Sequence, residues 1–140
     1  KSVLRLRIPA KEVGILFPLV GAQIQLAGKS LSLGELTLKP SLPKPTLWAK
    51  FVTLKGHTQA QSFHDKLREQ LCAIEKLGQD PAQVELLIAH RKVMRIHDKK
   101  VVGFRVITQG LNAQASIRLQ EVGLGGRRHM GAGLFIPKNK

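Results

Sequence analysis

The beginning of the chain carries short apolar patterns that change period twice. Residues 3–8 alternate apolar and polar side chains, so they predict a strand, which Pro9 ends. Residues 10–17 place their apolar side chains on one helical face, and Pro18 stops the predicted helix. Residues 24–38 alternate again around glycine-containing turns and predict two or three short strands.

A proline-rich segment separates this part from the rest of the chain. Residues 39–45 hold three prolines in seven positions, which is typical of a stiff linker. We therefore expect two domains, one over residues 1–46 and one over residues 47–140.

Beyond the linker the pattern becomes longer and more regular. Residues 47–54 predict a strand, and Thr58 with Gln61 predicts a capping box at the start of a helix that runs to Gly78. The apolar residues of this helix recur every three or four positions. They are Phe63, Leu67, Leu71, Ile74 and Leu77.

The last third of the chain predicts a hairpin, a second helix and a final strand. Residues 84–89, 92–96 and 101–108 predict three strands, and the polar residues 97–100 join the last two of them as a hairpin. Asn112 is the expected N-cap of a second helix that Gly123 closes. Residues 134–136 predict the last strand.

The order of these elements indicates an α+β fold. From residue 47 onward it is β-α-β-β-α-β, the ferredoxin-like (RRM-like) arrangement, with two helices on one face of an antiparallel sheet. Residues 1–46 give the pattern of the second half of the same unit. We therefore predict tandem ferredoxin-like domains. From this pattern we expect the first domain to lack its opening β-α-β segment, which accords with a chain that begins at Lys1 without Met.

The charge of the chain favours a polyanionic partner. Its 140 residues include 23 Lys plus Arg and 9 Asp plus Glu, a formal net charge of +14. Residues 91–105 hold six Lys or Arg against one Asp, and residues 118–140 hold five against one Glu, whereas residues 57–86 are net negative. A concentrated basic surface attracts phosphate backbones, although a solvated basic face is the alternative reading. An anionic membrane is disfavoured, because no basic amphipathic helix is present.

Other features narrow the class of protein. The single cysteine, Cys72, excludes an intramolecular disulfide and a Cys-based zinc cluster. No apolar run approaches the ~20 residues that span a bilayer, and no His pair shows metal-ligand spacing with carboxylates. We expect a soluble cytoplasmic protein that needs no cofactor or metal.

The most specific motif is a glycine-rich loop between the second helix and the last strand. Residues 123–133 place five glycines around Arg127, Arg128 and His129. Glycine allows backbone N–H groups to approach phosphates closely, and arginine supplies planar donors. The loop lacks the Gly-Lys-Ser/Thr of a Walker loop, and it follows a helix, unlike a dinucleotide fingerprint. It therefore predicts contact with nucleic acid and not with a nucleotide cofactor.

The spacing of this loop resembles a known family. It reads glycine, apolar, glycine, five residues, glycine, small residue, glycine, which is similar to the signature loop of the repeat-associated mysterious proteins (RAMP superfamily) of CRISPR systems. Residues 118–121 and 51–58 resemble the branch of prokaryotic CRISPR-associated endoribonucleases that process precursor crRNA. The resemblance covers essentially the whole chain.

The resemblance implies a metal-independent ribonuclease acting in antiviral defence. Such an enzyme cuts the CRISPR repeat at the base of a hairpin by attack of a 2′-hydroxyl, which leaves a 2′,3′-cyclic phosphate. It stays bound to the crRNA 3′ hairpin with the other subunits of a type I (Cascade-like) interference complex. The family's catalytic His lies on the first helix of the N-terminal domain, the part that the pattern above indicates is missing. The alternatives are a non-catalytic RNA-binding subunit of a CRISPR ribonucleoprotein and a general RNA-binding protein.

The candidate site residues fall into three groups. His57 and His129 are candidates for proton transfer. The predicted RNA contacts of the loop are Gly123, Gly125, Gly126, Arg127, Arg128, His129, Gly131 and Gly133. The predicted contacts of the hairpin are Arg91, Lys92, Arg95, Lys99, Lys100 and Arg105. Because the chain has one tryptophan, Trp48, and no tyrosine, we expect recognition through phosphates and shape more than through stacked bases.

Overall fold

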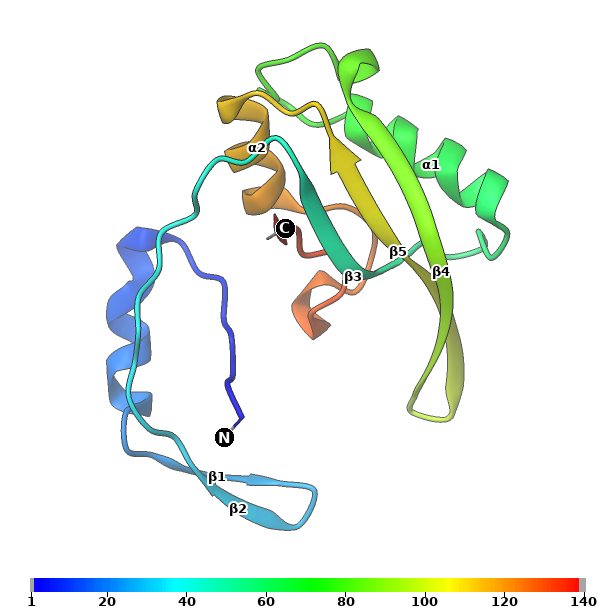
Figure 1. Cartoon of the computed structure of the whole chain (residues 1–140). Coiled ribbons are helices and arrows are strands. Elements are labelled where there is room, and N and C mark those ends of the chain that lie inside the picture. The colour runs from blue at the N-terminus through cyan, green and yellow to red at the C-terminus, as the bar shows by residue number, and fades with distance from the viewer. Residues whose placement is uncertain (1, 139–140) are drawn as a thin grey trace. The chain divides into compact units, whose positions relative to one another are not determined.

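The computed structural model describes residues 2–138. Lys1 and residues 139–140, at the outer ends of the two predicted domains, lie outside the described residues. The chain divides into two compact units, Lys1–Pro40 and Ser41–Lys140, so residues 41–46 belong with the second unit. Figure 1 shows the elements of both units. The interpretation of the first unit as an incomplete ferredoxin-like domain stays a prediction.

The first unit is a helix followed by a small hairpin. The 3-10 helix η1 spans Ala10–Leu19, and strands β1 (Gln23–Leu26) and β2 (Lys29–Ser32) pair antiparallel. None of residues 2–40 is fully buried. The predicted helix and short strands are present, but the helix is a 3-10 helix that includes Pro18, the residue predicted to stop it. Residues 2–40 have no buried core of their own.

The strand predicted for residues 3–8 is wrong, because no described segment is hydrogen-bonded to it as a neighbouring strand. Alternating apolar and polar residues give the segment one apolar side, but a strand also needs a neighbouring strand to hydrogen-bond its backbone groups. Leu4 is 63% exposed and Leu6 is 55% exposed, so most of the apolar side is uncovered. Residues 36–38, a possible third short strand, are also irregular.

The second unit is a four-stranded antiparallel sheet with two helices. The strand order is β4-β5-β3-β6, and every neighbouring pair is antiparallel. Together with the chain order β-α-β-β-α-β, this confirms the predicted ferredoxin-like arrangement. The elements are β3 (Leu47–Thr53), α1 (Ala60–Cys72), β4 (Glu85–Ile96), β5 (Lys99–Gln109), α2 (Ala113–Val122) and β6 (Ile136–Pro137), with 3-10 turns η2 (Pro81–Gln83) and η3 (Arg128–Met130).

One face of this sheet carries the core. The register places Ala49, Val106 and Ile88 side by side across three strands, and the next row toward the start of β3 is Leu47 with Thr108. Both helices contribute to the same cluster, so both cover this face, which we name the helix-covered face. The helical residues in the core are Phe63, Leu67 and Leu71 of α1 and Ala115 and Leu119 of α2. We name the opposite side the helix-free face.

Two bulges interrupt the sheet at the same level. In β3 the register shifts between Ala49 and Val52, so that Lys50 and Phe51 together lie opposite Arg105. In β4 it shifts between Ala89 and Arg91, which leaves His90 as an extra residue. The predicted strands 84–89 and 92–96 are therefore one long strand with a bulge. A bulge changes the face on which the following side chains lie.

The start of α1 differs from the prediction. Its N-cap is Gln59, and no side chain caps it, so the capping box of Thr58 and Gln61 is absent. The amide of Gln61 instead donates to Asp65 Oδ1 at 3.0 Å, one turn further along the helix. The helix also ends at Cys72, before Gly78, yet Leu77 still reaches the core from the turn that follows.

The start of α2 agrees with the prediction. Asn112 Oδ1 accepts a 2.8 Å bond from the N–H of Ala115, and Asn112 Nδ2 donates to the carbonyl of Gly78 at 2.8 Å. Gly123 ends the helix with a positive φ of 64°.

We expect Asn112→Ala to lower the free energy of unfolding by about 1–2 kcal/mol, because it removes both the cap and the bond to Gly78. Denaturant unfolding measures this change. Thr58→Ala is the matched control and should stay within about 0.5 kcal/mol, because no side-chain cap is lost. Equal losses in the two variants would show that the cap assignment is wrong.

Candidate nucleic-acid interface

The glycine loop, residues 123–133, completes the side of β3 that β6 leaves unpaired. β6 pairs only with Leu47 and Trp48. Further along β3, the N–H of Gly133 donates to the carbonyl of Phe51, and the N–H of Gly126 donates to the carbonyl of Thr53, each at 2.8 Å. The loop therefore takes the place of a neighbouring strand along the second half of β3.

The predicted role of the loop's backbone N–H groups needs correction. Besides the bonds of Gly126 and Gly133, the N–H of Gly125 donates to Gln70 Oε1 at 2.8 Å. An added Cβ at Gly125 would lie 2.8 Å from the carbonyl oxygen of Thr53. These glycines allow the loop to pack against β3, and their N–H groups are used by the protein. Contact with a phosphate through this part of the loop therefore depends on side chains.

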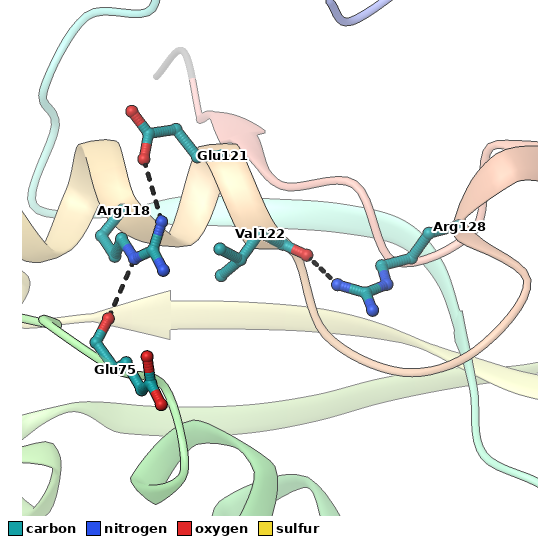
Figure 2. A network of polar contacts seen from close by, with 5 residues as sticks. All are labelled: Glu75, Arg118, Glu121, Val122 and Arg128. Atoms are coloured by element: carbon teal, nitrogen blue, oxygen red, sulfur yellow. Dashed lines mark hydrogen bonds and ion pairs between the residues drawn. The ribbon is translucent and has the colours of Figure 1, made fainter. Parts of the chain in front are cut away.

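The Arg-Arg-His sequence forms the exposed turn η3 of the loop. Arg127 has a left-handed backbone (φ 53°), and its guanidinium lies 3.7 Å from Met130 Sδ. Arg128 Nη1 donates to the carbonyl of Val122, the last residue of α2 (Figure 2). Arg128 therefore also holds the end of that helix, whereas Arg127 and His129 are exposed without such a bond to the helix.

The segment that leads into the loop fixes α2 in place. Arg118 Nε donates to the carbonyl of Glu75 at 3.0 Å, and its Nη1 lies 3.4 Å from Glu121 Oε2 (Figure 2). The buried amide of Gln120 donates to the carbonyl of Leu42 at 2.8 Å. This part of the family-like sequence has a structural role in holding the base of the loop.

The predicted basic hairpin is confirmed as a long two-stranded ribbon. Beyond Gly103, β5 pairs only with β4, and Figure 1 shows the two strands running on past the end of β3. His97 and Asp98 form the turn, with φ of 46° and 63° as a two-residue hairpin turn requires. We name residues 91–103 the basic ribbon.

The basic residues of β4 and β5 divide between the two faces. Arg91 pairs with the core residue Phe104, so it lies on the helix-covered face, where its Nε donates to the carbonyl of Thr58 at 3.4 Å. Arg95 and Lys100 follow on that face by alternation. Lys92, Lys99 and Arg105 lie on the helix-free face. The six cations predicted as one group are therefore two groups.

The loop and the ribbon lie on either side of β3 at the same end of the sheet. A row of four residues crosses this end: Gly126, Thr53, Gly103 and Lys92. A hydrogen bond joins Gly126 to Thr53, and Gly103 pairs with both Thr53 and Lys92. Neighbouring strands lie about 4.8 Å apart, so Gly126 of the loop lies about 10 Å from Gly103 and about 14 Å from Lys92 of the ribbon. The ion pairs found among residues 2–138 include no residue of either. This end of the sheet is therefore strongly positive.

His57 and His129 both belong to this end of the sheet. His57 follows β3 in a turn, where its N–H donates to the carbonyl of Leu54 at 3.1 Å. Its Nδ1 is buried and finds no hydrogen-bond partner within the described chain. His129 lies on η3 of the loop that bonds to Thr53. Among residues 2–138, no three His, Cys, Asp or Glu side chains are grouped so as to hold a metal ion.

Comparison with known proteins assigns the chain to a family. The family described as Cas6 Crispr matches residues 1–140. The chain belongs to the Cas6 family. It is 42% identical over 140 residues to the CRISPR-associated endonuclease Cas6 of Myxococcus xanthus (strain DK1622), a match that covers 100% of this chain and 58% of that protein. The chain thus spans little more than half the length of this Cas6 relative.

A solved structure agrees with the Cas6 fold. The protein of a Cas6-related gene from Pyrococcus furiosus superposes with a TM-score of 0.55 at 16% identity, covering 84% of this chain and 59% of that chain. At this identity the likeness concerns the fold alone. In the part of the chain that is described, no helix combines the length and apolar character that a membrane crossing requires.

Proposed function

We propose that this Cas6-family chain binds CRISPR repeat RNA and processes precursor crRNA by cutting within the repeat. The observation that carries the proposal is the family match over residues 1–140. The positive end of the sheet supports it, because the glycine loop and the basic ribbon there offer cations on both sides of β3.

The proposed cleavage proceeds by internal transesterification without a metal ion. The 2′-oxygen forms a bond to the adjacent phosphorus, and the bond from phosphorus to the 5′-oxygen breaks. The 2′-hydroxyl loses its proton to a base, and the leaving 5′-oxygen takes a proton from an acid. His57 and His129 are the candidates for these transfers, and Arg127 is the candidate for stabilising the charge on phosphorus.

The proposal extends to the assembly of the protein. Residues 47–140 serve as the C-terminal RNA-binding domain, and residues 1–46 as the second half of an N-terminal ferredoxin-like domain. After cleavage the protein stays on the 3′ hairpin of the crRNA, in the prokaryotic cytoplasm, together with the other subunits of a type I interference complex. Retention on the product follows if the positive surface binds the hairpin and not the cut segment.

Incubation of the purified chain with a labelled repeat hairpin in EDTA tests the proposed function. We expect one cut that leaves a 2′,3′-cyclic phosphate. His57→Ala or His129→Ala should lower its rate by about 100-fold or more, with hairpin affinity changed only a few-fold. His64→Ala, a half-exposed position on α1, is the control. Tight binding without cleavage would favour a non-catalytic subunit. Equal affinity for the repeat hairpin and for an unrelated RNA hairpin would contradict the proposal.

A further inference from the structure

The bulge in β3 brings together two aromatic side chains that regular alternation would separate. Trp48 and Phe51 are three residues apart, so in a regular strand they would lie on opposite faces. Trp48 pairs with Ile107 on the helix-free face. A Cβ built on Gly103, which lies on the same face, would meet the ring of Phe51 at 2.5 Å. The Phe51 ring therefore lies over Gly103, on the same face as Trp48.

Arg105 occupies the strand position between the residues of β5 that face the two rings. On β5 it occupies the position between Gly103 and Ile107, and its guanidinium carbon lies 5.3 Å from the centroid of the Trp48 ring. Its Nε is buried and has no hydrogen-bond partner within the described residues. No carboxylate of residues 2–138 forms an ion pair with it. The helix-free face thus carries an aromatic ring, a guanidinium plane and a second ring in sequence.

The surroundings of this row favour an anionic, planar ligand. Lys50 and His90, the extra residues of the two bulges, are exposed beside Arg105, and Lys92 follows on the same face. Trp48, Phe51 and Arg105 are each half-buried, so part of each remains accessible. Unpaired RNA bases stack on aromatic rings and on guanidinium planes, while lysines bind the phosphates between them.

We propose that Trp48, Phe51 and Arg105 form a stacking platform for unpaired bases of the bound RNA, next to the positive end of the sheet. The inference rests on the proposed RNA-binding function and deepens it, because it adds single-stranded nucleotides to what the protein recognises. It also revises the expectation from the sequence that stacked bases contribute little. One tryptophan and no tyrosine are sufficient, because a bulge and a glycine place Phe51 on the same face as Trp48.

The fluorescence of Trp48 tests the platform without any substitution, because it is the only tryptophan of the chain. We expect an unstructured RNA of about eight nucleotides to quench its emission, since a stacked base lies against the ring. Inorganic polyphosphate of similar charge should bind the basic surface without this quenching, because it has no bases. RNA binding without quenching, or equal quenching by polyphosphate, would overturn the proposal.

Two variants separate stacking from phosphate contacts. Phe51→Leu and Arg105→Met should each weaken binding of this RNA about tenfold. The neutral change Phe51→Leu should leave the slope of log K against log salt unchanged, whereas loss of a phosphate contact lowers it by about 0.7 on a single strand. Phe17→Leu, at an exposed phenylalanine of the first unit, is the matched control and should change nothing.

The outcomes distinguish this inference from the function on which it rests. The repeat hairpin could bind and be cut while RNA leaves the Trp48 fluorescence unchanged and the Phe51→Leu variant binds RNA normally. In that case the platform is wrong and the proposed function stands. If no RNA binds, both fail. A quench by RNA that is lost in Arg105→Met, with the polyphosphate affinity lowered only a few-fold, supports the platform.

Discussion

Gly133→Ala is expected to lower the free energy of unfolding by about 3 kcal/mol and to displace the glycine loop. The residue has a φ of 70°, and a Cβ there would lie 2.0 Å from the carbonyl oxygen of Leu124. The loop cannot easily move aside, because the N–H of Gly133 is bonded to Phe51 and its carbonyl accepts from the N–H of Leu124. Denaturant unfolding measures the loss, and RNA affinity should fall with it.

Gly131→Ala is the matched control in the same loop. Gly131 has a φ of 90°, so alanine is strained there too, but a Cβ would meet no atom within 4 Å. Only the conformational cost of about 1–2 kcal/mol remains. Similar losses in the two variants would mean that the contact between Gly133 and Leu124 does not constrain the loop.

The double variant Arg127→Ala with Arg128→Ala should weaken binding of the repeat hairpin about 100-fold. A hydrogen bond from a charged group contributes about 1.5–3 kcal/mol, and two arginines at the centre of the loop offer several such bonds to phosphates. Equilibrium binding at two or more salt concentrations measures the effect. Unchanged affinity would show that the loop does not contact RNA.

A second pair of cations controls for net charge. Lys66→Ala with Lys76→Ala also removes two positive charges, outside the loop and the ribbon, so a loss of RNA affinity through overall charge alone would be equal in both double variants.

The single arginine variants separate the effect on RNA binding from the effect on folding. Arg127→Ala should leave stability unchanged, whereas Arg128→Ala loses its bond to Val122 and should cost about 1 kcal/mol.

Local patterns predicted most of the second unit. The hairpin around residues 97–100 and the cap at Asn112 depend on neighbouring residues, so the sequence alone indicates them, although Lys99 and Lys100 already pair within β5. The strand predicted for residues 3–8 depends on a partner that alternation does not supply. The capping box failed for a related reason, since Gln61 has another partner in Asp65 one turn away.

The candidate site was predictable in charge but not in arrangement. The cations of the ribbon and the loop follow from the sequence. The two faces on which those cations lie do not, because the bulges at Lys50–Phe51 and at His90 are set by pairing across strands. The position of the Phe51 ring over Gly103 has no signal in the sequence except an isolated glycine in a strand pattern. The sequence also does not indicate that Gly125 packs against the backbone of Thr53, because this contact depends on how the loop folds onto β3.

The position of β4 as the outermost strand has a consequence for solubility. The strand is twelve residues long and, among residues 2–138, pairs only with β5, so it presents a row of unpaired backbone groups at a sheet edge, where another chain could add a strand. Arg91, Lys92 and Arg95 and the bulge at His90 lie along that edge. Like charges repel a second copy of the same strand, and the bulge breaks its register. The cations proposed to hold RNA thereby also protect the protein from edge-to-edge aggregation while no RNA is bound.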